Sequence, residues 1–117
     1  MRTVLLLAAT APFFLAALPA SADDRDIAAA ISVGAYTDAE QALNAQLRAN
    51  PGLPELLLNL AAVYAKTGRD SEARAIYAQV LAQRDVMMDL PSGKIAGSHA
   101  IATTGLKLVT SVQITSR

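Results

Sequence analysis

Residues 54–81 carry apolar side chains at helical spacing twice in succession, and no other stretch constrains the fold as strongly. The first half places them at i, i+3, i+4 and i+7, which gives a helix one apolar face: Leu57, Leu60, Ala61 and Tyr64. The second half repeats this spacing: Ala73, Ile76, Tyr77, Val80 and Leu81. Between the halves, Gly68 is typical of a helix end and Asp70 of a helix start. The stretch therefore predicts two antiparallel helices joined by a tight turn.

The same features occur once more, 34 residues earlier in the chain. Four pairs of positions match at this offset: Gly34 with Gly68, Thr37-Asp38 with Ser71-Glu72, Ala39 with Ala73, and Leu43 with Tyr77. A fixed period of this length indicates a helical repeat. Alanines at matching positions are expected where two helices cross closely.

Helix boundaries follow from local signals in the first half of the chain. Asp23-Asp24-Arg25-Asp26 leads into an apolar run that predicts a first helix, because carboxylates favour a helix N-terminus through its dipole. Thr37 and Glu40 have the spacing of a capping box, which predicts a second helix through about Ala49. Asn50-Pro51-Gly52 is expected to end that helix.

The periodic positions resemble the tetratricopeptide repeat: Leu57, Leu60, Ala61, Tyr64, Gly68, Ala73 and Tyr77. The resemblance implies an all-α fold, a short α-solenoid of two helix-turn-helix repeats at about 23–53 and 54–85. Pro51 closes the first unit, as a proline often does in this family, but Asp85 stands at that place in the second. A third repeat in the same register is therefore not predicted.

The resemblance also implies a partner groove on the inner surface of the solenoid. Its lining would come from one helix: Glu55, Leu58, Asn59, Ala62, Ala65 and Lys66. Family members that grip a peptide's terminal carboxylate use lysine, arginine and asparagine there, and in this chain only Asn59 and Lys66 could serve. The alternative is that Leu58 and Ala62 pack on another helix of the same chain, and the sequence leaves both interpretations open.

Residues 1–22 have the pattern of a secretory signal peptide. A basic start precedes an uncharged apolar run from Val4 to Leu18, and Ala20-Ser21-Ala22 has the small-x-small form of a cleavage site before Asp23. We expect cleavage there and a periplasmic or secreted protein. The alternative is an uncleaved membrane anchor, but Pro12 and Pro19 interrupt the run, and its dense apolar part is short for the roughly 20 residues of a spanning helix.

Composition narrows the classes of partner and chemistry. The chain has no cysteine, so disulfides, thiol catalysis and cysteine zinc sites are excluded. Residues 23–117 carry ten acidic and, without Arg2, nine basic side chains, a formal charge of −1. Nucleic acid is not an expected partner, because its binders usually present a basic face.

Residues 86–117 depart from the repeat pattern. Val86–Leu90 and Lys94–Gly97 have the pattern of an irregular link and are also compatible with a small hairpin that turns at Pro91 to Gly93. Ser98 could cap a fifth helix from His99 to about Thr110, which would cover the open side of the second repeat with its apolar residues: Ile101, Leu106 and Val109. Alternating apolar residues over 106–114 also permit a strand.

No residue pattern indicates catalysis. His99 is the only histidine, and Ser98 directly precedes it without a G-x-S-x-G motif, so an acyl-transfer site is not predicted. Metal ligands at a suitable spacing and glycine-rich phosphate loops are lacking, and neither a cofactor nor a small-molecule substrate is expected. We interpret the chain as a non-enzymatic protein–protein interaction module that acts as an adaptor or scaffold for a protein or peptide partner. The alternatives are a self-assembling homodimer and a membrane-anchored assembly factor.

Overall fold

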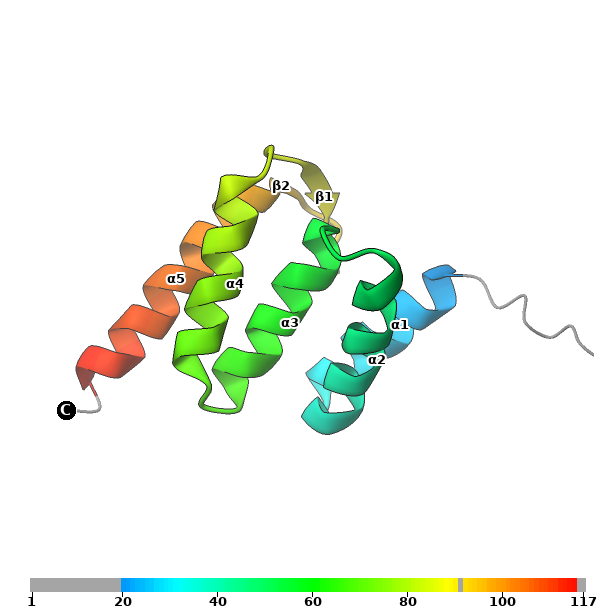
Figure 1. The fold of residues 1–117 in the computed structure, drawn as a ribbon, viewed down its shortest axis with the longest axis horizontal. Coiled ribbons are helices and arrows are strands. Elements are labelled where there is room, and N and C mark those ends of the chain that lie inside the picture. The colour runs from blue at the N-terminus through cyan, green and yellow to red at the C-terminus, as the bar shows by residue number, and fades with distance from the viewer. Residues whose placement is uncertain (1–19, 91, 116–117) are drawn as a thin grey trace, which may run out of the picture.

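The computed structural model describes residues 20–90 and 92–115, which form five helices and one two-stranded sheet (Figure 1). The helices are α1 (Ala20–Ser32), α2 (Tyr36–Ala49), α3 (Pro54–Lys66), α4 (Asp70–Ala82) and α5 (Ser98–Thr115). The strands β1 (Met87–Asp89) and β2 (Ile95–Gly97) lie between α4 and α5. The predicted all-α solenoid with a C-terminal helix is confirmed, and the small sheet is an addition to it.

The helices reproduce the period read from the sequence. α1 and α3 both begin and end 34 residues apart, and α2 and α4 begin 34 residues apart. Each helix packs on the next one along the chain, so the helices form a row from α1 to α5 (Figure 1). The two helix pairs are therefore structural repeats.

Both repeats turn with the same backbone motif. Gly34 and Gly68 have φ angles of 82° and 80°, in the left-handed region that favours glycine. After each glycine, the next amide donates to a carbonyl five residues back: Ala35 to Ala30 and Arg69 to Tyr64, both at 2.8 Å. These bonds satisfy carbonyls that the helix end leaves free. The predicted helix ends at the two glycines are confirmed.

The predicted capping box at Thr37 and Glu40 is wrong. α2 begins two residues earlier than that pattern implies, with Ala35 instead of Thr37 at the cap position, and no side chain caps it. The Glu40 carboxylate does not reach back to its own helix start, because it pairs with Arg69 of the next repeat. α4 does begin at Asp70 as predicted, although again no side chain caps the helix.

Two apolar clusters form the core. The first joins α3, α4 and α5: Leu57, Leu58, Ala61, Ala73, Tyr77, Val80, Ala102 and Val109. The second joins α1, α2 and α3: Ile27, Ala39, Leu43, Leu56, Leu60 and Val63. Ala39 and Ala73 are at most 1% exposed, as expected for close helix crossings. Tyr64 and Leu47 contact both clusters, so the repeats share one continuous interior.

The C-terminal extension forms the predicted hairpin and helix. β1 and β2 pair antiparallel, with Met88 opposite Ala96, and Gly93 turns with a φ angle of 87°. Pro91, the first residue of the predicted turn, lies outside the described residues. Residues 106–114 are helical, which decides between the helix and the strand. α5 packs on α4 and α3 and covers the second repeat as predicted, because Ala102 and Val109 are buried beside Tyr77.

The N-terminal helix begins before the expected cleavage position. α1 starts at Ala20, whereas the signal peptide is expected to end at Ala22. The apolar run that carries that expectation lies outside the described residues. Within residues 20–90 and 92–115, no helix combines the length and apolar character of a membrane span.

Candidate functional site

A hollow of about 450 Å³ lies where the C-terminal half of α3 and the middle of α5 face each other over α4. Three helices line it: Ala62, Ala65 and Lys66 of α3, Asp70 and Tyr77 of α4, and Gly105, Leu108 and Val109 of α5. The lining is apolar except for one lysine, one aspartate and the tyrosine. We call this hollow the α3–α5 groove.

The repeat architecture creates this groove. The turn after Gly68 brings the start of α4 beside the end of α3, which places Asp70 and Lys66 together at one end of the hollow. The Tyr77 ring lies directly against Gly105, where a side chain would have no room. Burial raises the pKa of the Tyr77 hydroxyl above its ordinary value.

The structure separates the six residues predicted for the partner groove. Ala62, Ala65 and Lys66 line the α3–α5 groove. Leu58 is only 7% exposed and belongs to the cluster that α5 covers, which favours the second of the two interpretations left open by the sequence. Its burial follows from packing on another helix of the same chain. Glu55 is exposed and Asn59 half-buried, and neither is among the residues that line the hollow.

Sequence reasoning missed the wall that α5 contributes. Gly105, Leu108 and Val109 reach the groove only because α5 folds back beside α3. The one signal in the sequence was Leu108, a large apolar residue that follows Lys107 in a helix with several threonines and a serine. In the structure its side chain is 62% exposed.

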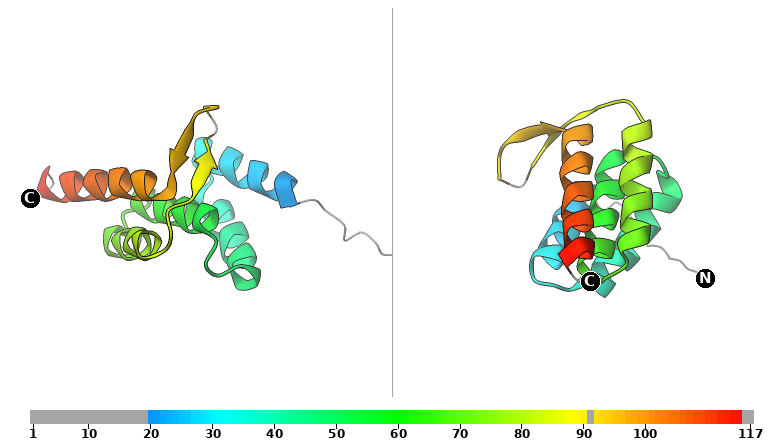
Figure 2. Two further views of the ribbon diagram at one scale, coloured as in Figure 1. Left: turned by 90° about the horizontal axis from the view of Figure 1, so that it is seen from above. Right: turned by 90° about the vertical axis from the view of Figure 1, so that its left-hand side faces the viewer.

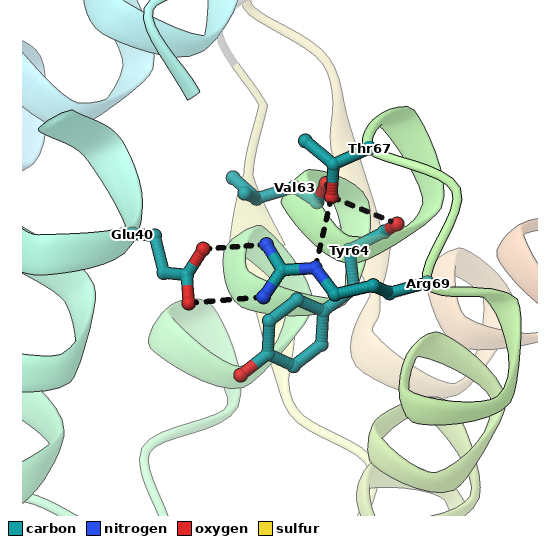
Figure 3. A network of polar contacts seen from close by, with 5 residues as sticks. All are labelled: Glu40, Val63, Tyr64, Thr67 and Arg69. Atoms are coloured by element: carbon teal, nitrogen blue, oxygen red, sulfur yellow. Dashed lines mark hydrogen bonds and ion pairs between the residues drawn. The ribbon is translucent and has the colours of Figure 1, made fainter. Parts of the chain in front are cut away.

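A polar network outside the groove joins the two repeats (Figure 3). The Arg69 guanidinium donates to both carboxylate oxygens of Glu40, at 3.1 and 2.5 Å. It also donates to Thr67 Oγ1 and lies over the Tyr64 ring, 4.3 Å from its centroid (Figure 3). The hydrogen bonds from Arg69 lower the pKa of the Glu40 carboxyl. Glu40 belongs to the first repeat and Arg69 to the second, so the network positions one repeat on the other.

Ser98 and His99 form a second polar junction, between α4, the hairpin and α5. Ser98 is fully buried, and its hydroxyl accepts from the Val86 amide at 3.0 Å and donates to Asp85 at 3.4 Å. His99 Nε2 lies 2.7 Å from the Gln83 carbonyl oxygen, which can only accept, so the ring donates there. Both side chains are committed to backbone groups, which is a structural role.

The cap of α5 comes from Asp85, not from Ser98. The Asp85 carboxylate accepts the His99 amide at 3.0 Å, and this bond is the main reason that its pKa is lowered. Ser98 is the first residue of the helix instead of its cap. The signal for this role was Asp85 itself, the residue that stands where the repeat pattern has a proline. Among the described residues, no group of three or more histidines and carboxylates is placed to hold a metal ion.

Comparison with known families agrees with this architecture. A sequence model of the tetratricopeptide repeat family matches residues 30–86, just under half of the chain. No curated protein and no solved structure matches the chain. The matched segment contains α2, α3 and α4, with their 34-residue period and glycine turns. Tetratricopeptide repeats in general mediate protein–protein interactions and are not enzymes. Residues 30–86 are therefore a tetratricopeptide repeat segment, as the sequence resemblance implied.

Proposed function

We propose that the protein is an adaptor or scaffold that holds a segment of a partner protein in the α3–α5 groove. The observation that carries this proposal is the groove itself, an apolar hollow whose lining includes three of the residues expected from the repeat pattern. A volume of about 450 Å³ falls within the range of roughly 300–1,000 Å³ typical of ligand sites.

The lining favours a particular kind of segment. Ala62, Ala65 and Val109 offer apolar contact, which favours an aliphatic or aromatic side chain as the anchor. Lys66 and Asp70 lie at the same end with opposite charges, so they offer a hydrogen-bond donor and an acceptor to peptide groups next to the anchor. The groove does not gather the several cations that would select a free carboxylate.

We further propose that this binding takes place in the periplasm or outside the cell. The support is the signal-peptide pattern of residues 1–22. The chain has no cysteine, so no disulfide would stabilise it after export. An adaptor in that compartment would have to be stable through packing alone. The continuous core of the two clusters supplies such packing.

Affinity capture from envelope extract tests the proposal. The bait is the chain from Ala20 onward, and Ala62→Glu is the variant that places a charge in the groove. Ala78→Glu is the matched control, because Ala78 is exposed on the outer side of α4. We expect a partner that binds the parent chain and Ala78→Glu, and that binds Ala62→Glu roughly tenfold or more weakly. A partner retained equally by all three chains would place the binding surface elsewhere.

A further inference from the structure

The hairpin and α5 enclose a second hollow, which adjoins the α3–α5 groove. Its volume is about 410 Å³, and Ala100, Ile101 and Thr104 of α5 form one wall. Leu90 and Ala96 of the hairpin form the other wall. Figure 2 shows the hairpin extending away from the helices beside the first turns of α5. We call this space the hairpin hollow.

Three residues line both spaces: Tyr77, Gly105 and Leu108. The α3–α5 groove and the hairpin hollow are therefore continuous along one side of α5. Val109 lines only the groove and Thr104 only the hollow. These two residues are five positions apart, which is about 7.5 Å along the helix axis. The surface thus offers two adjacent places for a side chain.

A cation stands at the hairpin end of these two spaces. The Leu90 amide donates to the Lys94 carbonyl at 2.8 Å, which extends the antiparallel ladder of β1 and β2 by one pair. Residues opposite each other in such a ladder share a face of the sheet, so Lys94 is on the face of Leu90 and Ala96. That face lines the hairpin hollow, and the same register puts Asp89 on the opposite face.

No carboxylate of the described residues pairs with Lys94. The one ion pair that they form joins Arg69 to Glu40, and residues 98–111 of α5 include neither aspartate nor glutamate. Lys94 is exposed, so its ammonium group can meet a carboxylate of a partner. An exposed pair of this kind adds little affinity and mainly fixes the orientation of the bound segment.

We propose that the partner segment is an extended chain that fills both spaces with two apolar side chains, one residue apart, and places an acidic side chain beside Lys94. Alternate side chains of an extended chain point to the same side at a spacing of about 6.7 Å. This spacing is close to the separation of the two spaces along α5. The inference rests on the proposed function, because it takes the α3–α5 groove as part of the binding surface.

The polar groups of the lining favour an extended chain over a helix. Lys66 and Asp70 lie in the groove and Thr104 in the hairpin hollow, where they offer hydrogen-bond donors and acceptors. An extended chain carries free peptide N–H and C=O groups that these side chains can bind, whereas a helix pairs these groups internally. Leu108, which is 62% exposed at the boundary of the two spaces, keeps the two anchors apart.

Fluorescence anisotropy with defined peptides tests this inference on the chain from Ala20 onward, which contains every described helix and strand. The probe is labelled Glu-Ser-Leu-Ser-Leu-Ser-Glu, with an acidic residue at each end so that both chain directions are tested. We expect it to bind roughly tenfold or more tightly than the same peptide with its second leucine replaced by serine. Equal affinities would overturn the inference, and so would the absence of binding by either peptide.

A third peptide tests the extended conformation. Its two leucines are separated by three alanines, which places them one turn apart on a helix. We expect this peptide to bind more weakly than the peptide with one serine between the leucines. Tighter binding would overturn the extended arrangement.

Two threonines provide a matched pair of variants for the hairpin hollow. Both are exposed, but only Thr104 lines the hollow, so Thr104→Arg fills it and Thr103→Arg does not. We expect Thr104→Arg to reduce the affinity of the two-leucine peptide to that of the one-leucine peptide, and Thr103→Arg to leave it unchanged. Ala62→Glu should abolish binding of both peptides. Loss of binding with Ala62→Glu but not with Thr104→Arg would overturn this inference and leave the proposed function intact.

Charge reversal at Lys94 tests the position of the acidic side chain. We expect Lys94→Glu to weaken the two-leucine peptide by roughly threefold and to strengthen, by a similar factor, a peptide with lysine at both ends. Lys107→Glu is the control, because it changes the net charge equally at an exposed position that lines neither space. Equal responses of the two variants would contradict the pairing with Lys94.

Discussion

The ring of Tyr77 in α4 lies directly against the backbone of Gly105 in α5. A Cβ atom added at Gly105 would be 2.3 Å from Tyr77 Cζ, which is closer than carbon atoms pack. The contact explains why a helix that covers the second repeat contains a glycine in its middle. Both residues also line the α3–α5 groove.

Gly105→Ala should destabilise the protein for this reason. Overpacking costs about 1–3 kcal/mol, and at the upper part of that range it exceeds the roughly 1 kcal/mol that alanine gains over glycine inside a helix. The free energy of unfolding from urea denaturation measures the net effect. Gly52→Ala is the control, because a Cβ there meets only Gln83 Nε2 at an ordinary 3.6 Å. An increase in stability for Gly105→Ala would show that α4 and α5 are not in this contact.

Ala73→Leu should also lower the free energy of unfolding, by about 1–3 kcal/mol, because it overpacks a helix crossing. Ala73 is fully buried where α4 meets α3 and α5. Ala78→Leu adds the same atoms to the exposed side of α4 and serves as the control. If the two variants unfold at the same urea concentration, the repeat alignment that places Ala73 at a crossing is wrong.

Asp85 should make the attachment of α5 sensitive to acid. Its pKa is lowered in the folded protein, first by the His99 amide, so its contribution to stability is present above the unfolded value near 3.8. That contribution is lost as the pH falls through the lower folded pKa. Asp85→Ala should therefore be less stable than the parent at neutral pH, and the difference should shrink in acid. The urea midpoint at several pH values measures it, and a difference that is constant with pH would contradict the cap.

Signal-peptide cleavage during export should remove part of the first turn of α1. Cleavage after Ala22 would leave a protein that begins at Asp23, three residues inside α1. The intact mass of the protein recovered from the periplasm or medium tests this expectation. A mass that includes residues 1–22 would support the membrane anchor instead.

The repeat architecture could be predicted because its signals are periodic and local. Gly34 and Gly68 each end a helix through their own backbone conformation, and Ala39 and Ala73 mark crossings at the same offset. The contacts that were missed join residues far apart in the chain. Glu40 has the spacing of a capping box, but its partner Arg69 lies 29 residues away and competes successfully for the carboxylate.

The candidate groove could be predicted only on the side that the repeat itself supplies. Ala62, Ala65 and Lys66 follow from the helix face of α3. Whether Leu58 lines the groove or is buried in the core depends on the position of α5. α5 follows a hairpin that has no counterpart in the repeat pattern. The direction of α5 is set by Asp85, whose carboxylate reaches a backbone amide 14 residues away. A periodic pattern in the sequence does not predict a hydrogen bond of this kind.

The α3–α5 groove is tested most directly as the binding surface by mapping where a captured partner binds. Amide chemical shifts of the chain from Ala20 onward can be followed by nuclear magnetic resonance as the purified partner is added. We expect the largest shifts along the α3–α5 groove, at Ala62, Ala65, Lys66 and Val109, and we expect Ala62→Glu to abolish them. Shifts concentrated instead on the outer side of α4 around Ala78, with the groove unaffected, would contradict it.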